Sequence, residues 1–246
     1  MKKSKVFVLT LPGDDARRAP LLSELERQGI DYELFFGING RNGLSPEHEK
    51  MVDRAAAEQV MRRVLTNGEF ACALSHRAIY ERVLAEGLDA AMVLEDDALL
   101  RPDLGDFVRA GGLYAAPMIL LDYSRVSVSR VSGKPFQGFG RLWRVVVTPM
   151  LATGYVVSAS AARALLKRTT PIQAVADWPG DIYELKAYAL SPRLVDHLPE
   201  GNDLSHLAAG RAINKPRSIV KSRFRYFTST YWRGYLRRRL SMRIDP

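Results

Sequence analysis

Three consecutive acidic residues, Glu95, Asp96 and Asp97, directly follow the short apolar run at residues 90–94. In an extended segment alternate side chains share a face, so we expect Glu95 and Asp97 to point together and Asp96 to point away. Carboxylate oxygens suit Mg²⁺ or Mn²⁺, and these ions usually bind together with substrate phosphates. Open α/β sheets bind ligands at the carboxyl ends of their strands, so the triplet predicts a metal or ligand site. The alternative is that these acids only cap the following turn.

Other residues offer acid–base or ligand chemistry. Cys72 lies one turn before His76 in a segment with helical spacing, and on spacing alone both are more typical of packed core residues. Asp177 and Asp181 flank a Trp-Pro-Gly turn, where an acid is either a general base or an Asx-turn residue. His197 follows an apolar stretch and is a further candidate ligand.

The predicted strands and helices that carry these residues have the order typical of an α/β protein. A β-branched run at residues 5–11, a helical pattern at 16–27 and a second strand at 31–36 predict the start of a parallel sheet. A loop rich in glycine and asparagine follows, then helical patterns at 45–66 and 69–85. Beyond the strand at 90–94 we expect four further strands or helices and one long loop: strands at 118–122, 142–147 and 151–157, a helix at 159–168, and a loop over 124–140.

Composition limits the class of protein. The 246 residues are 47% apolar and 26% charged, which is typical of a soluble globular chain with a sizeable core. The single cysteine excludes an internal disulfide and favours a reducing compartment. No apolar run approaches the ~20 residues of a membrane span, and the N-terminal apolar stretch ends at Pro12, too early for a signal peptide. We therefore expect a cytoplasmic protein.

Positive charge is concentrated at the C-terminus. The net charge is +9, yet residues 211–246 alone carry eleven Lys or Arg and one acid, so residues 1–210 are nearly neutral. Aromatic and aliphatic residues alternate with the arginines at helical spacing, which indicates a basic amphipathic helix that binds an anionic membrane surface. A disordered solubilising tail and a nucleic-acid-binding segment are the alternatives, and the neutral body argues against the second.

Taken together, these pieces resemble glycosyltransferase family 25, the group that contains lipooligosaccharide β-galactosyltransferases. The resemblance covers residues 5–206, and it rests on the combination rather than on any one motif. The matching residues, in chain order, are Arg17-Arg18 after the first strand, Gly68-Glu69-x-x-Cys72-x-x-Ser75-His76, Glu95-Asp96-Asp97, Thr153-Gly154-Tyr155-x-x-Ser158, and Asp177 before Pro192. The chain departs from the family at Thr10, Asn39 and Ala71, and the first two changes concern the half expected to hold the nucleotide.

The resemblance implies a GT-A-like single domain over residues 1–210 with a Rossmann-like mixed sheet, followed by the basic helical tail. It implies an inverting, metal-dependent transfer of a sugar, with galactose favoured, from a UDP-sugar to a lipooligosaccharide or lipopolysaccharide acceptor at the inner face of a bacterial membrane. The expected roles are Asp177 as base with Asp181 as substitute; Glu95, Asp97 and His197 as ligands of Mn²⁺ or Mg²⁺; and donor contacts from Leu9, Thr10, Arg17, Arg18, Ser75, His76, Glu95 and Asp96.

Two other classes fit parts of the same evidence. A metal-dependent phosphohydrolase or nucleotidyltransferase would use the same acids, but it would release phosphate or pyrophosphate instead of UDP. A nucleic-acid-binding protein would use the basic tail, although the acidic triplet would repel a phosphate backbone unless a metal were bound.

Overall fold

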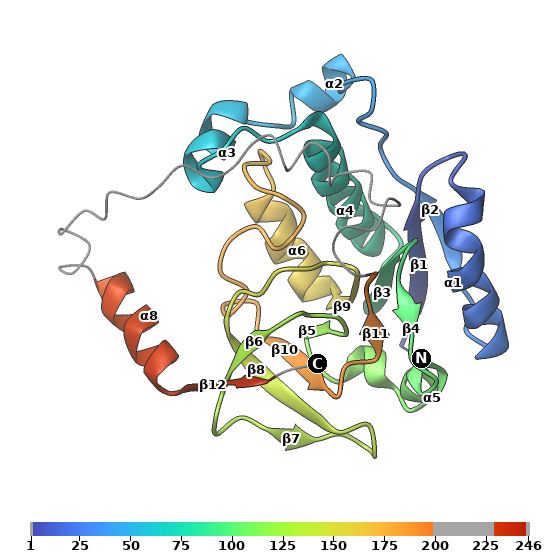
Figure 1. Ribbon diagram of the computed structural model, residues 1–246, viewed down its shortest axis with the longest axis vertical. Coiled ribbons are helices and arrows are strands. Elements are labelled where there is room, and N and C mark those ends of the chain that lie inside the picture. Colours follow the sequence, from blue (N-terminus) through green and yellow to red (C-terminus); the bar gives the residue numbers. More distant parts are fainter. Residues whose placement is uncertain (1, 199–228, 245–246) are drawn as a thin grey trace.

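Strand β1 (Ser4–Thr10) lies inside a mixed sheet, between two parallel neighbours. The computed structural model describes residues 2–198 and 229–244 (Figure 1). β2 (Glu33–Phe36) pairs with one side of β1 and β3 (Ala90–Glu95) with the other. Helix α1 (Asp15–Arg27) connects β1 to β2. The strand–helix–strand opening predicted from the sequence is therefore confirmed.

Between β2 and β3 the chain forms α2 (Pro46–Glu49), α3 (Arg54–Met61) and α4 (Asn67–Ala85). The prediction of one helix over residues 45–66 is wrong, because Val52 leaves the helical path to form a bridge with Ile172. Asp53 then begins α3 by accepting a hydrogen bond from the Ala56 amide at 2.9 Å. Such side-chain caps satisfy backbone donors at a helix start, so a short break in a helical pattern is easily stabilised.

The remaining strands extend the sheet beyond β3. The order across the sheet is β12-β6-β8-β10-β5-β9-β3-β1-β2, with β7 paired to β8, and a separate two-stranded sheet joins β11 to β4. β9 pairs antiparallel with both β3 and β5, whereas β5 and β10 are parallel. The bounds are β4 (Leu99–Leu100), α5 (Leu104–Arg109), a 3₁₀ turn (Gly112–Tyr114), β5 (Met118–Leu120), β6 (Val126–Ser129), β7 (Lys134–Pro135), β8 (Arg141–Val147), β9 (Gly154–Ser158), α6 (Ala159–Arg168), β10 (Ala187–Ser191), β11 (Val195–Asp196), α8 (Ser229–Arg239) and β12 (Ser241–Ile244).

Alternation along the strands divides the core into two layers. In β1, Phe7 faces a cluster that includes residues of α4 and α6, and Val8 faces a cluster that includes residues of α1 and α5. The central strands are apolar on both faces because helices cover both sides, as is typical of parallel sheets. A third cluster packs α3 against the start of α4. The predicted mixed α/β class is confirmed.

The C-terminal segment differs from the expected separate tail. β12 pairs antiparallel with β6, so residues 241–244 form an edge of the main sheet instead of continuing a helix. β6 itself lies within residues 124–140, which were expected to form a loop. Half of the predicted tail, residues 211–228, lies outside the described residues. Within the described part of the chain, no helix combines the length and the apolar character needed to cross a membrane.

Candidate functional site

The direction in which successive strands are added to the sheet reverses at β1, because β2 lies on one side of it and β3 on the other, and the predicted site lies at this reversal point. From β1 the chain passes over one face of the sheet through α1 to β2, and it returns over the other face through α4 to β3. The two parallel strands therefore end side by side with their helices on opposite faces, and this is the position at which open α/β sheets bind their ligands. Leu9 pairs in register with Glu95, and Thr10 and Asp96 are the next residues along.

Arg17 of α1 holds two of the three acids. Its guanidinium contacts the Asp96 carboxylate at 2.7 Å and the Asp97 carboxylate at 2.6 Å. Asp96 also accepts a hydrogen bond from the Thr10 hydroxyl at 2.8 Å. The strand ends at Glu95, so side-chain alternation does not continue through the triplet. The expected arrangement, in which Asp96 alone points away, is corrected: Asp96 and Asp97 share Arg17, and Glu95 contacts His76.

The carboxylate of Asp97 is poorly neutralised by protein groups. Burial and the nearby charge of Glu95 raise the pKa of Asp97 to about 6 from its ordinary 3.8, against the opposing effect of Arg17. The Asp97 Oδ1 atom is buried and has no hydrogen-bond partner among the described residues. A buried polar atom without a partner is costly, and a cation would satisfy it. Of the two acids predicted as ligands of a divalent ion, Asp97 therefore offers a buried oxygen that such an ion would satisfy, and Glu95 lies near enough for its charge to raise the pKa of Asp97.

Glu95 begins a chain of buried polar groups that runs to α4. Its Oε1 lies 3.1 Å from His76 Nε2, and the other ring nitrogen, Nδ1, lies 2.8 Å from the Tyr155 hydroxyl. That hydroxyl donates to the hydroxyl of Tyr80 at 3.3 Å. Burial raises the pKa of Tyr80 and of Tyr155, so both phenols stay neutral. His76 is thus a fixed partner of Glu95 and not an isolated core residue.

His197 contacts Asp122 and not Glu95 or Asp97, the acids with which it was predicted to bind a metal ion. Its Nδ1 is 3.1 Å from both carboxylate oxygens of Asp122, whose side chain is fully buried at the end of β5. Arg193 also contacts Asp122, at 3.4 Å. Burial raises the pKa of Asp122, while His197 and Arg193 oppose the rise. The structure does not bring Glu95, Asp97 and His197 into one compact group of ligand atoms among the described residues.

The loop that carries the two candidate bases packs beside the polar chain. Trp178 is buried, with its ring 5.0 Å from that of Tyr155 between centroids, and its positive φ of 63° turns the backbone sharply after Asp177. Asp177 is half-buried next to this anchor. Asp181 is exposed, accepts a hydrogen bond from the Tyr183 amide at 3.0 Å, and pairs with Arg237 of α8 at 2.9 Å.

Ser75 and Arg18, which were also predicted to contact the donor, make contacts with neighbouring parts of the protein. Ser75 donates to the carbonyl of Ala71 at 2.7 Å and accepts from the amide of Ile38 at 2.8 Å, so it connects α4 to the loop after β2. Arg18 is mostly buried, ion-paired with Asp15 and 3.4 Å from the Thr10 hydroxyl. Of the two arginines, Arg17 is the one that contacts the acidic triplet.

Two features of the site were missed by the sequence reasoning. Asp122 follows an apolar strand just as Glu95 does, so the same signal was present there with a single acid. Tyr80 belongs to no recognisable motif, and Tyr155 belongs to the Thr153–Ser158 motif without an assigned role, because a tyrosine in an apolar strand or helix is normally a packing residue. Only the tertiary pairing of β9 with β3 places Tyr155 beside His76.

Comparison with known proteins gives one match to a family. The model of that family, described as "Glycosyltransferase family 25 (LPS biosynthesis protein)", matches residues 3–181, which is more than half of the chain. The matched region contains α1, α4, the acidic triplet, Asp122 and the loop to Asp181. His197 and α8 lie beyond it.

Relatives match over shorter stretches. The chain is 24% identical over 170 residues to the lipooligosaccharide biosynthesis protein lic2B of Haemophilus influenzae, covering 65% of this chain and 61% of that protein. It is 31% identical over 101 residues to the lacto-N-neotetraose biosynthesis glycosyltransferase LgtE of Neisseria meningitidis, covering 41% and 35%. It is also 38% identical over 96 residues to a probable inactive glycosyltransferase 25 family member 3 of Rattus norvegicus, covering 38% and 17%. The chain thus spans less than two thirds of the length of each of these relatives.

Proposed function

The chain belongs to glycosyltransferase family 25, and we propose that it transfers a sugar from a UDP-sugar to a lipooligosaccharide or lipopolysaccharide glycan. Galactose is the sugar that the family resemblance favours. Two bacterial relatives whose names refer to lipooligosaccharide or glycan biosynthesis support this acceptor class. The observation that carries the proposal is the buried acidic cluster at the reversal point of the sheet, with an unsatisfied oxygen on Asp97.

Glu95 and Asp97 would hold Mn²⁺ or Mg²⁺. Such an ion, when bound, stabilises as a Lewis acid the negative charge that builds on a departing diphosphate. Arg17 keeps Asp96 and Asp97 side by side, and its guanidinium stands at the edge where a diphosphate would lie. The nucleotide would therefore bind to the part of the protein formed by β1, α1 and the end of β3.

We propose Asp177 as the base that accepts the proton of the acceptor hydroxyl. Inversion requires direct attack by that hydroxyl on the face opposite the leaving group, as in inverting glycosidases, which activate water in the same way. Asp181 is the alternative, but its carboxylate is already engaged by Arg237 and by a backbone amide. Asp177→Asn should abolish turnover while UDP binding persists. Loss of turnover in Asp181→Asn with normal turnover in Asp177→Asn would move the assignment to Asp181.

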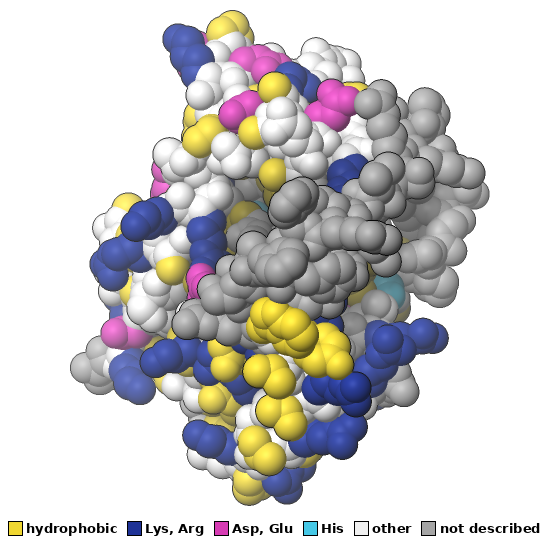
Figure 2. Space-filling view, turned by 90° about the vertical axis from the view of Figure 1, so that its left-hand side faces the viewer, with side chains coloured by type: hydrophobic (Ala, Val, Ile, Leu, Met, Phe, Trp, Pro, Cys, Tyr) yellow, Lys and Arg dark blue, Asp and Glu magenta, His cyan; other side chains and the backbone are white. Residues whose placement is uncertain are grey.

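We also propose that α8 places the protein on an anionic membrane surface, where a lipid-linked acceptor is found. Trp232, Leu236 and Leu240 are more than half exposed, and Arg238 and Arg239 are exposed beside them. Figure 2 views the side on which α8 lies and shows hydrophobic side chains gathered next to Lys and Arg. Apolar side chains flanked by cations are typical of helices that lie in the membrane interface.

Vesicle flotation tests this placement with point variants, because deletion of the whole tail would also remove β12 from the sheet. Leu236→Ser with Leu240→Ser should lower binding to vesicles that contain anionic lipid. Val60→Ser, which changes an exposed apolar residue on α3, is the matched control. Equal flotation of the double variant and the control would refute the membrane role.

The enzymatic proposal is tested by product analysis with a panel of UDP-sugars and a lipooligosaccharide acceptor. We expect UDP and a glycosylated acceptor, formed only when a divalent ion is present. The test is informative because some relatives carry the word inactive in their names. Release of inorganic phosphate or pyrophosphate without sugar transfer would support a phosphohydrolase or nucleotidyltransferase instead.

A further inference from the structure

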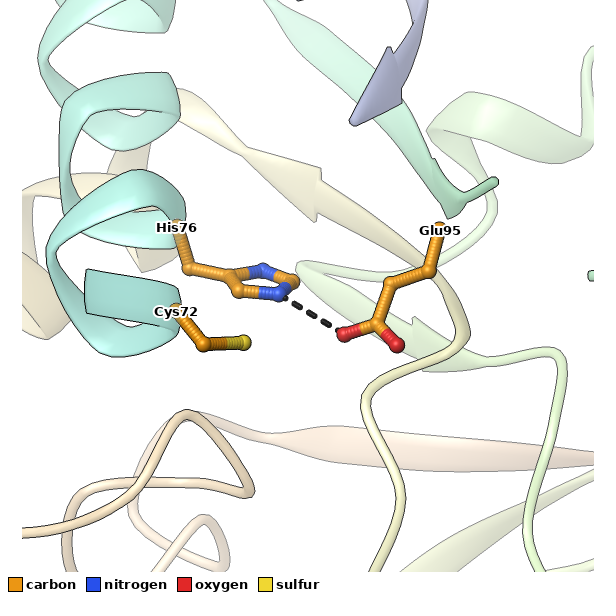
Figure 3. A group of neighbouring side chains, drawn as sticks. All are labelled: Cys72, His76 and Glu95. Atoms are coloured by element: carbon orange, nitrogen blue, oxygen red, sulfur yellow. Dashed lines mark hydrogen bonds and ion pairs between the residues drawn. The ribbon is translucent and has the colours of Figure 1, made fainter. Parts of the chain in front are cut away.

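Cys72, His76 and Glu95 form a compact group at the border between α4 and the end of β3. One ligand atom from each residue, the thiol sulfur, a ring nitrogen and a carboxylate oxygen, lies within 4.8 Å of the other two. Figure 3 shows the two α4 side chains, one helical turn apart, pointing toward the Glu95 carboxylate. The sequence alone favours a packing role for Cys72, because this grouping depends on a tertiary contact.

The His76 ring is already oriented as a metal ligand would be. Its side chain is almost fully buried, and Nδ1 lies 2.8 Å from the Tyr155 hydroxyl, which leaves Nε2 on the side of Glu95. Metal-binding histidines commonly donate their second ring N–H to a neighbouring oxygen, which fixes the tautomer. With a metal bound, Nδ1–H would donate to the Tyr155 oxygen, because Tyr155 donates its own proton to Tyr80, and Nε2 would release to solvent any proton that it shares with Glu95.

Thiolate, imidazole and carboxylate together are the ligands that zinc prefers. Tetrahedral zinc places two such ligand atoms roughly 3.3 to 3.6 Å apart, given bonds of about 2.0 to 2.3 Å. The observed separation of 3.1 Å between His76 Nε2 and Glu95 Oε1 is close to this spacing. The Cys72 sulfur lies within 4.8 Å of both of these atoms, so the third ligand atom is also near the place of the ion.

We propose that Cys72, His76 and Glu95 bind Zn²⁺ or a similarly thiophilic ion, with a fourth position left to water. On binding, the Cys72 thiol gives its proton to solvent and its sulfur bonds to the metal. The site is distinct from the place where Glu95 and Asp97 would hold Mg²⁺ or Mn²⁺, but it shares Glu95 with it. Zinc would therefore hold Glu95 in its present position beside His76 of α4 and inhibit sugar transfer; that consequence rests on the proposed function, whereas zinc binding itself does not.

Cys72 is the only cysteine in the chain, so any thiolate signal reports this site alone. Metal-free full-length protein is titrated with Cd²⁺ in the presence of a reductant that does not bind metal. We expect a thiolate-to-metal charge-transfer band that saturates at one equivalent and is removed by competing Zn²⁺. Cys72→Ser should lose the band, and His76→Gln should weaken zinc binding by about tenfold or more, while His48→Gln, a histidine on α2, should leave it unchanged.

A second measurement on the unaltered protein does not depend on the folding of any variant. Zn²⁺ should slow alkylation of Cys72 by iodoacetamide, and the same concentration of Mg²⁺ should not. Cadmium binding without a charge-transfer band, or alkylation at the same rate with and without Zn²⁺, would overturn the proposal. Neither measurement requires turnover, so failure of the zinc site and failure of the transferase proposal are distinguishable.

Discussion

Replacing Asp97 by asparagine should stabilise the metal-free protein at neutral pH. Asparagine keeps the shape of the side chain and an oxygen that can accept from Arg17, but it removes a buried charge next to Glu95. The pKa of Asp97 is raised from 3.8 to about 6, and this difference corresponds to at most about 3 kcal/mol of lost stability once the group is ionised.

The direction in which the free energy of unfolding changes with pH follows from proton binding to Asp97. Between about pH 4 and pH 6 the folded protein retains a proton on Asp97 that the unfolded chain has already lost. The free energy of unfolding therefore falls as pH rises through this window, and the full penalty is present above about pH 6. Below pH 4 the carboxyl is protonated in both states, so the wild-type protein and Asp97→Asn should be equally stable with respect to this group.

The assay is urea unfolding in EDTA at pH 8 and at pH 4, with the wild-type protein, Asp97→Asn and Asp106→Asn. Asp106 is an exposed acid on α5 that pairs with Arg109, so its variant controls for the loss of one surface charge. We expect Asp97→Asn to be more stable than wild type at pH 8 by up to about 3 kcal/mol, with the difference falling to about 0.5 kcal/mol at pH 4. A variant less stable than wild type at pH 8 would refute the description of Asp97 as a poorly neutralised buried charge.

Other substitutions probe the elements around the site. Glu69→Ala removes a fully buried carboxylate that pairs with Arg63 and caps α4, and it should lower the free energy of unfolding by about 3 to 5 kcal/mol in urea titrations. Gly40→Ala would place a Cβ atom 2.5 Å from a backbone carbonyl oxygen of α4, so calorimetry should show a loss of about 1 to 3 kcal/mol. Tyr155→Phe removes the hydroxyl that fixes His76, and it should cost about 1 to 3 kcal/mol and, under the proposed function, reduce kcat more than it changes the KM for the donor. A variant that unfolds like wild type would contradict the corresponding contact.

The strongly patterned elements of the fold could be predicted from the sequence. The elements β1, α1, α4, β3, β9 and α6 appear where apolar periodicity places them, because each strand is largely buried and each helix packs an apolar face against the core. The predictions that failed concern segments stabilised by tertiary contacts. The break between α2 and α3 depends on the bridge from Val52 to Ile172, and β12 exists because it pairs with β6.

The sequence indicates which types of residue belong to the candidate site, but it does not indicate which of them contact one another. A run of acids after an apolar strand predicts a ligand site at a strand end, and the structure places that run where β3 ends beside β1. Which acid meets which partner could not be read from spacing, because Arg17, His76 and Tyr155 reach the cluster from three different elements. For the same reason the partner of His197 is Asp122, which approaches from a neighbouring strand.

Anomalous X-ray scattering from crystals soaked with Mn²⁺ and UDP tests the central claim most directly. We predict a manganese peak within bonding distance of carboxylate oxygens of both Glu95 and Asp97, with the diphosphate of UDP on the same ion. A peak elsewhere, or bound UDP whose diphosphate lies apart from these two side chains, would contradict the account.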